Sequence, residues 1–126
     1  MAFNGYKNLK EVKFHPGLKT IYNKAFQHCR SLKEVSLPNP LKSIDEMVLQ
    51  DCRSLKQIKI PKKIKKIEQK IILGCKKLKK AVIPKSVKKI HKTAFSGCKK
   101  LVIHCQKGSY AHKYAKKQHI KYQLKK

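Results

Sequence analysis

The amino-acid sequence predicts an α/β-type repeat solenoid, a coil of short parallel strands and helical turns closed by a C-terminal helix and strand. A pattern of 23 residues is written four times in succession, from Leu9, Leu32, Leu55 and Leu78, and a shortened fifth copy begins at Leu101. Self-similarity at a fixed period of roughly 20 to 50 residues is the signature of a solenoid, in which each coil buries its apolar edge against the next. We therefore expect residues 23 apart to be neighbours in space.

Eight columns of apolar residues recur in every full copy and predict the core. In the first copy they are Leu9, Val12, Phe14, Leu18, Ile21, Ala25, Phe26 and Cys29. The residues 23, 46 and 69 places further on are apolar as well, although only 40% of the chain is apolar. The last column also holds Cys52, Cys75 and Cys98. Because free cysteine is among the most buried residue types, we expect these thiols to be reduced and stacked in the core.

Each copy is expected to contain a strand, a bend, a second short strand and a helical turn. Residues 32–37 alternate in their second half like a strand that faces a core on one side. Proline follows at positions 38, 61 and 84, where the strand must end because proline cannot donate to a β-ladder. Residues 41–44 are a brief extended segment, and the apolar spacing over residues 48–52 is that of one helical turn.

The two ends of the chain depart from the repeat. Residues 1–8 correspond to the second half of a preceding coil, residues 9–100 to four repeats and residues 101–126 to a cap. In the cap, residues 101–105 alternate like a strand, residues 110–115 form one apolar helix face after Ser109 as N-cap, and residues 120–124 alternate like a closing strand. Unpaired sheet edges invite another chain, so self-association through the N-terminal edge is left open.

The charge of the chain is strongly positive and graded. Lys and Arg total 33 against six acids, a formal net charge of +27, and residues 69–126 contain 18 Lys and no acid. A charge this far from zero opposes the compact state by self-repulsion and attracts polyanions.

The candidate partner-binding residues are cations that share a repeat position or point outward from the first strands. They are Lys10, Lys33, Lys56 and Lys79; Lys19, Lys42, Lys65 and Lys88; Arg30, Arg53, Lys76 and Lys99; and Lys13, Lys59 and Lys80. Because neighbouring strands lie about 4.8 Å apart, each set is expected to form a row along the solenoid. Such rows repel, and a solubilising surface explains them as well as a binding site does.

No pattern typical of an active site, a metal site or a cofactor site occurs. The column cysteines are predicted core, and no Gly-x-Ser-x-Gly is present. Cys98, His104, Cys105 and His112 are metal-ligand types without the Cys-x-x-Cys spacing of a zinc site. The only clustered acids, at positions 45, 46 and 51, are expected to be solvated. We predict a protein that is not an enzyme and that holds no catalytic residues, cofactor or metal.

Three features of the unit together resemble the BspA-type leucine-rich repeat family. They are the proline after the strand, the turn Ala-Phe-Ser-Gly-Cys at residues 94–98, and the closing segment Gly-Ser-Tyr-Ala-x-x-Tyr-Ala at residues 108–115. The resemblance implies a right-handed leucine-rich repeat coil. It also implies a surface or secreted module for adhesion and protein interaction, without enzymatic activity. This chain differs from that pattern in its basicity and in the lack of an export signal.

Three functional hypotheses remain from the sequence. The first is a protein-binding module whose basic surface engages an acidic protein or nucleoprotein. The second is electrostatic, non-sequence-specific RNA or DNA binding, or a small inhibitor or decoy of a nucleic-acid-handling enzyme such as a bacterial defence nuclease. The third is a fragment of a surface adhesin. No apolar run approaches the roughly 18 residues of a membrane span, so we expect a cytoplasmic protein, or a cell-surface location for such a fragment.

Overall fold

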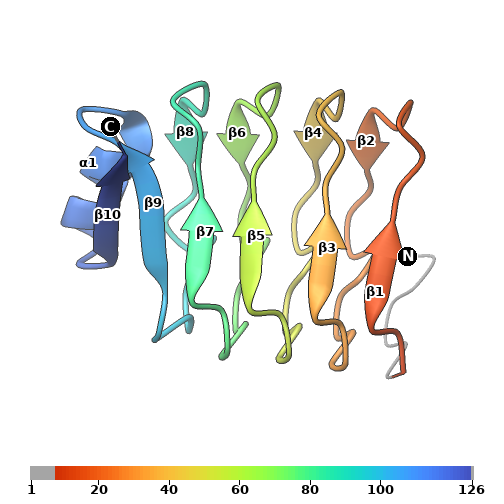
Figure 1. The fold of residues 1–126 in the computed structure, drawn as a ribbon. Helices are drawn as coiled ribbons and strands as arrows, with labels where there is room; N and C mark the ends of the chain where they lie inside the picture. Colours follow the sequence, from red (N-terminus) through yellow and green to blue (C-terminus); the bar gives the residue numbers. More distant parts are fainter. Residues whose placement is uncertain (1–7, 126) are drawn as a thin grey trace.

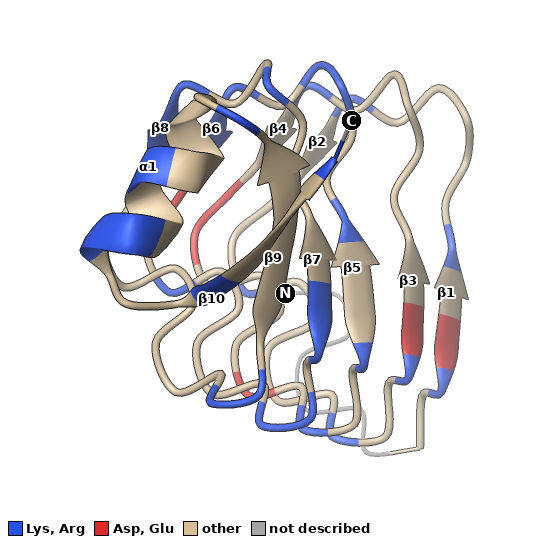
Figure 2. Ribbon diagram, turned by 60° about the vertical axis from the view of Figure 1, so that its left-hand side comes forward, with Lys and Arg blue, Asp and Glu red and all other residues tan. Residues whose placement is uncertain are grey.

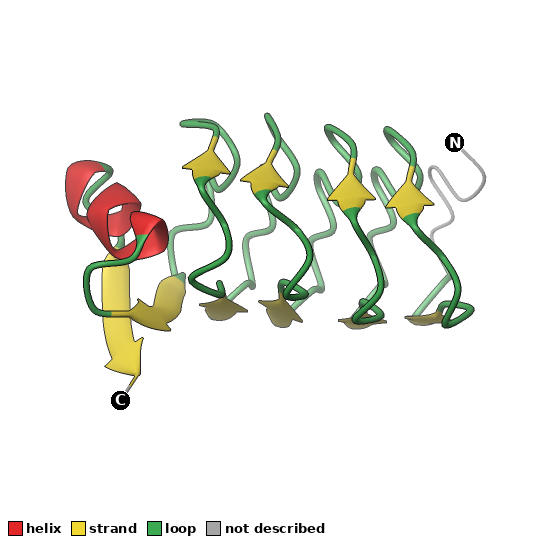
Figure 3. Cartoon of the chain, turned by 90° about the horizontal axis from the view of Figure 1, so that it is seen from above, coloured by secondary structure: helices red, strands yellow, loops and turns green. Residues whose placement is uncertain are grey.

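The computed structural model describes residues 8–125, which form a stack of coils (Figure 1). The front row contains β1 (Glu11–Lys13), β3 (Glu34–Ser36), β5 (Gln57–Lys59) and β7 (Lys80–Val82). The rear row contains β2 (Thr20–Ile21), β4 (Ser43–Ile44), β6 (Lys66–Ile67) and β8 (Lys89–Ile90). Seen from above, each coil runs from a front strand over a bend to a rear strand and returns through turns (Figure 3). The predicted solenoid is confirmed, whereas the half coil expected over residues 1–8 lies almost wholly outside the described residues.

Successive coils stack in the register that the 23-residue period predicts. We name them coil 1 (residues 9–31), coil 2 (32–54), coil 3 (55–77) and coil 4 (78–100). On the front row Val12 pairs with Val35 in parallel, and on the rear row Ile67 pairs with Ile90. Residues 23 apart are therefore spatial neighbours.

The apolar columns form one continuous core between the front and rear rows. In coils 2 to 4 the leading leucines Leu32, Leu55 and Leu78 are fully buried. In coil 1, Leu9 and Leu18 are only partly buried, because among the described residues this coil has a neighbour on one side only. Burial of apolar surface is the main favourable contribution to folding, and here it is shared by all coils.

The cysteine column confirms the expectation of reduced, buried thiols. All five cysteines are buried thiols outside any disulfide, namely Cys29, Cys52, Cys75, Cys98 and Cys105. Three of the thiols donate to a carbonyl of the preceding coil: Cys52 Sγ to Phe26 O (3.2 Å), Cys75 Sγ to Leu49 O (3.1 Å) and Cys98 Sγ to Ile72 O (3.1 Å). Each thiol therefore fills a small core site and also satisfies a buried acceptor.

In the turn that follows the rear strand, one repeat position has a left-handed backbone in all four coils, and a second, at Lys24, Met47 and Lys70, has it in coils 1 to 3. His28, Asp51, Gly74 and Gly97 occupy the first of these positions with φ between 62° and 80°. This conformation costs roughly 1–2 kcal/mol for a residue with a Cβ atom and nothing comparable for glycine. At this position the two glycines thus relieve coils 3 and 4 of a strain that coils 1 and 2 retain.

Replacing Gly97 with alanine is expected to lower the free energy of unfolding by more than Gly74→Ala does. Both changes place a side chain in the left-handed region, which costs about 1–2 kcal/mol. A Cβ atom at Gly97 also lies 3.4 Å from the backbone of Gly74, whereas one at Gly74 has 3.9 Å to its nearest neighbour, the Cα of Asp51. Urea unfolding of the two variants measures the difference, and equal losses would contradict the crowding at Gly97.

The C-terminal cap closes the stack with β9 (Val102–Gln106), α1 (Tyr110–Lys117) and β10 (Lys121–Lys125). Ser109 is the N-cap as predicted, because its side chain accepts a hydrogen bond from the backbone N–H of His112. The helix is fixed to coil 4 by Tyr114, whose hydroxyl donates to the carbonyl of His91 at 3.2 Å. β10 forms the outer edge of the four-stranded sheet β10-β9-β7-β5, and charged Lys121 and Lys125 at its ends discourage further pairing.

The stack has one discontinuity, the boundary between coils 2 and 3, which we call the seam. Neither β3 with β5 nor β4 with β6 forms a ladder within the described residues, although every other pair of successive coils does so on both rows. The turn side remains bonded across the seam, with the N–H of Leu49 2.9 Å from the carbonyl of Ile71 and that of Asp51 2.8 Å from Leu73. The sequence predicts continuous rows, so this interruption is a correction to that expectation.

Candidate protein-binding surface

The structure places the predicted cations on different parts of each coil rather than on one surface. Backbone hydrogen bonds show that lysines 23 residues apart are neighbours. In the first row they join Lys33 N to Lys10 O (2.9 Å) and Lys79 N to Lys56 O (2.8 Å), and in the second row Lys42 N to Lys19 O (2.9 Å) and Lys88 N to Lys65 O (2.8 Å). The first row precedes the front strands and the second precedes the rear strands. The seam divides both rows, because the bonds that would join Lys33 to Lys56 and Lys42 to Lys65 are absent among the described residues.

The third row contains the two arginines, and both are held by one acid. Asp51 accepts from Arg53 Nε at 2.8 Å, lies 3.7 Å from Arg30 and is 3.0 Å from His28 Nδ1. Burial alone would raise the pKa of the Asp51 carboxyl, but hydrogen bonds from Arg53 and His28 outweigh it and lower that pKa. Asp51 was expected to be solvated, yet only 18% of its side chain is exposed. These arginines join coil 1 to coil 2. Lys76 and Lys99 in the same row are exposed, and glycine stands in their coils at the repeat position of Asp51.

The front row changes from mixed to basic charge toward the cap (Figure 2). Glu11 and Glu34 lie side by side on β1 and β3, and Lys13 is 3.8 Å from Glu11. On β5 and β7 the exposed charges are Lys59 and Lys80. Partial burial, followed by the nearby charges of Lys80 and Lys125, lowers the pKa of His104 on β9. Of the predicted strand cations, Lys59 and Lys80 therefore lie on the basic part and Lys13 does not.

Two hollows of about 500 and 610 Å³ lie next to each other where the bends of coils 3 and 4 meet the cap. Both are lined by Lys85, Ser86 and Gln106. We call them together the basic trough. Its lysines are Lys59, Lys62, Lys85, Lys88, Lys107, Lys113 and Lys125. Its apolar lining consists of Ile60, Pro61, Val82, Ile83, Pro84 and the half-exposed Tyr110. The sequence analysis identified only Lys59 and Lys88 among these lysines, because the others come from bends and from the cap.

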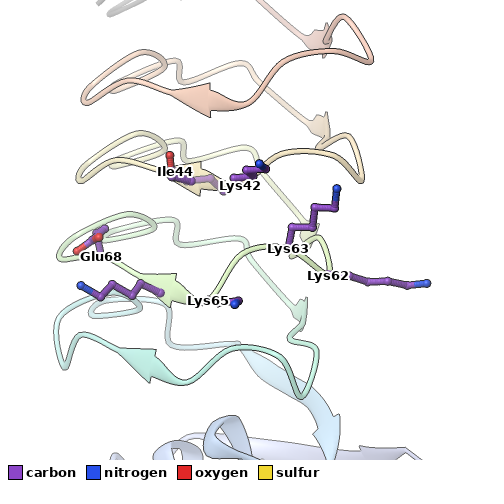
Figure 4. Close-up of a pocket in the computed structure, with 8 residues that line it drawn as sticks. Lys42, Ile44, Lys62, Lys63, Lys65 and Glu68 are labelled. Carbon is purple, nitrogen blue, oxygen red and sulfur yellow. The ribbon is translucent and has the colours of Figure 1, made fainter.

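A third hollow of about 630 Å³ opens at the seam between β4 and β6 (Figure 4), and we call it the seam cleft. It is lined by Lys42, Ser43, Ile44, Lys62, Lys63, Lys65, Lys66 and Glu68. Lys62 belongs to both the seam cleft and the basic trough. Its lining thus contains five lysines and one acid, which gives the hollow a positive charge.

The buried column cysteines lack the chemistry of an active-site nucleophile. Burial raises the pKa of the Cys52 thiol to about 12 and that of Cys98 to about 11, so neither is a thiolate near neutral pH. Residues 8–125 contain no cluster of three or more His, Cys, Asp or Glu side chains that could hold a metal ion. No helix in the same residues is long and apolar enough to cross a membrane.

Comparison with models of known protein families shows to which family the chain is related. The model of the BspA type leucine rich repeat region matches residues 1–102 in six copies. The chain belongs to the BspA-type leucine-rich repeat family. A comparison with curated proteins gives no match.

Solved structures of bacterial leucine-rich repeat proteins share the fold. A leucine-rich repeat protein of T. pallidum is 32% identical with a TM-score of 0.78, covering 82% of this chain and 49% of its own. A leucine-rich cell surface protein of Faecalibacterium prausnitzii A2-165 is 29% identical with a TM-score of 0.59, covering 83% and 34%. A leucine-rich repeat protein of Bacteroides ovatus ATCC 8483, at 24% identity and a TM-score of 0.70 over 97% and 38%, supports the BspA-type fold alone. The chain thus spans a third to a half of these proteins.

Proposed function

We propose that this leucine-rich repeat protein is a non-enzymatic binding module that engages an acidic protein surface through the basic trough and the adjoining strands β5 and β7. The observation that carries the proposal is the composition of the trough, in which seven lysines and several apolar residues line two adjoining hollows. Charge brings an acidic partner to this edge, and burial of the apolar surface that is still accessible there, at Val82, Pro84 and Tyr110, stabilises the contact once it has formed.

The same composition favours a protein over a nucleic acid. Lysine contacts phosphates as a point charge and reads no bases, and sites for single strands depend on aromatic platforms. Among the described residues the exposed large aromatic side chains are Tyr22, Tyr110 and Tyr122, and only Tyr110 lines the trough. Nucleic acid, or the nucleic-acid site of an enzyme, is therefore the alternative that rests on charge alone.

The adhesin alternative has one supporting observation of its own. The F. prausnitzii relative is described as a cell surface protein, and this chain corresponds to 34% of its length. A repeat segment of such a protein would present the same trough outside the cell. The binding chemistry that we propose is the same in either location.

The test compares a trough variant with a matched charge variant. Lys59→Glu/Lys85→Glu/Lys125→Glu reverses three trough charges, and Lys10→Glu/Lys33→Glu/Lys76→Glu makes the same net change on exposed positions elsewhere. The probes are a random Glu/Tyr copolymer, poly-glutamate of matched charge and a DNA duplex, each titrated by fluorescence anisotropy at about 150 mM salt. We expect the copolymer to bind best, and the trough variant to lose about tenfold in its affinity while the control loses little.

Two results would contradict this proposal. If both triple variants weaken copolymer binding equally, the interaction depends on net charge and not on the trough. If DNA binds as tightly as the copolymer and loses affinity steeply with added salt, the electrostatic nucleic-acid alternative is favoured.

A further inference from the structure

The seam cleft exposes backbone groups that every other boundary on the rear row uses for pairing. Between coils 1 and 2 the N–H of Ser43 donates to Lys19 at 3.2 Å, and that of Asp45 donates to Ile21 at 2.9 Å. Between coils 3 and 4 the N–H of Lys89 donates to Lys65 at 3.3 Å, and that of His91 donates to Ile67 at 2.9 Å. The repeat thus has a fixed pair of donors two residues apart, one on each rear strand and one directly after it.

At the seam the same two donors are the N–H groups of Lys66 and Glu68. Their acceptors by repeat position are the carbonyls of Lys42 and Ile44, and neither bond forms within the described residues. Because successive residues of a strand present their backbone groups to opposite edges, Lys66 offers both its N–H and its C=O to the cleft. The edge of β6 is therefore an open parallel-sheet edge inside a hollow.

The spacing of these groups matches an extended polypeptide. Lys66 and Glu68 are two residues apart, and a strand rises about 3.3 Å per residue, so a peptide strand brings a carbonyl to each N–H in turn. Addition of a strand to an exposed sheet edge is a recurrent mode of peptide recognition, in which main-chain hydrogen bonds give affinity and side-chain contacts give specificity. Nucleic acids and inorganic polyanions lack this alternation of donors and acceptors.

The side chains around the edge specify the charge of such a peptide. Lys42 belongs to coil 2, whereas Lys63 lies on the bend of coil 3 and Lys65 directly precedes β6. Figure 4 shows Lys63 extending toward the level of coil 2. All three side chains are exposed, and Glu68 is the only acid in the lining. Carboxylates along a bound strand would relieve the repulsion among these ammonium groups.

We propose that the seam cleft binds an extended acidic peptide segment, whose backbone pairs with Lys66 on β6 and with Glu68 directly after it, and whose carboxylates contact Lys42, Lys63 and Lys65. The site deepens the function proposed above, because it gives an acidic partner a second point of attachment next to the basic trough, to which Lys62 connects it. Turn-side bonds such as Leu49 N to Ile71 O keep coils 2 and 3 joined while the cleft is occupied.

Amide hydrogen exchange followed by NMR tests the site on the intact protein. In the free protein we expect the amides of Lys66 and Glu68 to exchange faster than their repeat equivalents Lys89 and His91, which are hydrogen-bonded. Saturation with octaglutamate is expected to slow exchange at Lys66 and Glu68 severalfold. An octaglutamate with alternate backbone nitrogens methylated, and inorganic polyphosphate of equal charge, are expected to bind without slowing these two amides.

Charge variants locate the contact independently of exchange. Lys42→Glu/Lys65→Glu is expected to lower octaglutamate affinity about tenfold, and Lys10→Glu/Lys19→Glu, which makes the same charge change on coil 1, is expected to lower it far less. Protection of Lys66 and Glu68 in the free protein, or their unchanged exchange under saturating octaglutamate, would overturn the site. Loss of copolymer binding in the trough variant together with unresponsive seam amides leaves the proposed function standing and rejects the seam cleft alone.

Discussion

Replacing Leu55 with alanine is expected to lower the free energy of unfolding by about 2–5 kcal/mol, the range for removal of a fully buried leucine side chain. Leu55 is 0% exposed and begins coil 3 directly at the seam. Because both strand ladders are absent at this boundary, packing and the turn-side bonds carry most of the coupling between coils 2 and 3. We therefore also expect the variant to unfold in two steps, coils 1 and 2 before the remainder, in urea unfolding followed by circular dichroism and tyrosine fluorescence.

The matched control is Leu78→Ala, one repeat further along the chain. Leu78 is equally buried, but β5 pairs with β7 and β6 with β8 across its boundary. Stability is expected to fall by a similar amount while both probes keep a single shared transition. If Leu55→Ala also unfolds in one step, the seam does not weaken the coupling between coils, since neighbour interactions set the cooperativity of a repeat protein.

Alkaline pH is expected to destabilise the folded protein, because the buried thiol of Cys52 and the buried hydroxyl of Tyr114 ionise more easily in the unfolded chain. Burial raises the pKa of the Cys52 thiol from 9.0 to about 12, and that of the Tyr114 hydroxyl from 10.0 to about 12. A group whose pKa is raised by folding stabilises the folded state fully below its unfolded pKa, and this contribution falls as pH rises through the folded pKa. Between pH 9 and 12 the Cys52 thiol alone lowers the free energy of unfolding by roughly 1 kcal/mol per pH unit, because the unfolded chain releases its proton first.

Cys52→Ala isolates this effect from the titration of the lysines, which is common to both proteins. Near pH 8 the wild type is expected to be more stable, because the variant has lost a buried side chain and its hydrogen bond to Phe26. The difference in the free energy of unfolding should shrink from pH 8 to pH 11, measured in urea with a reducing agent present. A difference that stays constant over this range would show that the Cys52 thiol ionises as easily when folded as when unfolded.

The parts of the fold that repeat every 23 residues were predictable, because the periodicity fixes which positions face the core. Leu55 and its column, the thiol of Cys75 and the N-cap Ser109 all lie where the pattern places them. Each of these positions is decided by local spacing and by burial, and both can be read along the chain.

The parts that depend on differences between repeats were not predictable in the same way. Asp51 shares its position with His28 and two glycines, and only the fold shows that it contacts both arginines. The trough combines bend residues of two coils with Lys107 and Lys125 of the cap. One sequence signal did exist, since Lys62 and Lys85 share a repeat position. The open seam is a property of one boundary between coils, and a column pattern that is shared by all repeats does not distinguish one boundary from another.

Because one column cysteine lies in each coil, the reactivity of its thiol can report how often that coil opens locally. Cys29, Cys52, Cys75 and Cys98 are enclosed one per coil, so an alkylating reagent reaches each sulfur only when that coil transiently exposes its interior. Mass spectrometry of partially alkylated protein would rank the four coils by how often they open locally, without any introduced cysteine. The order in which the four thiols react therefore gives the order of local stability along the stack.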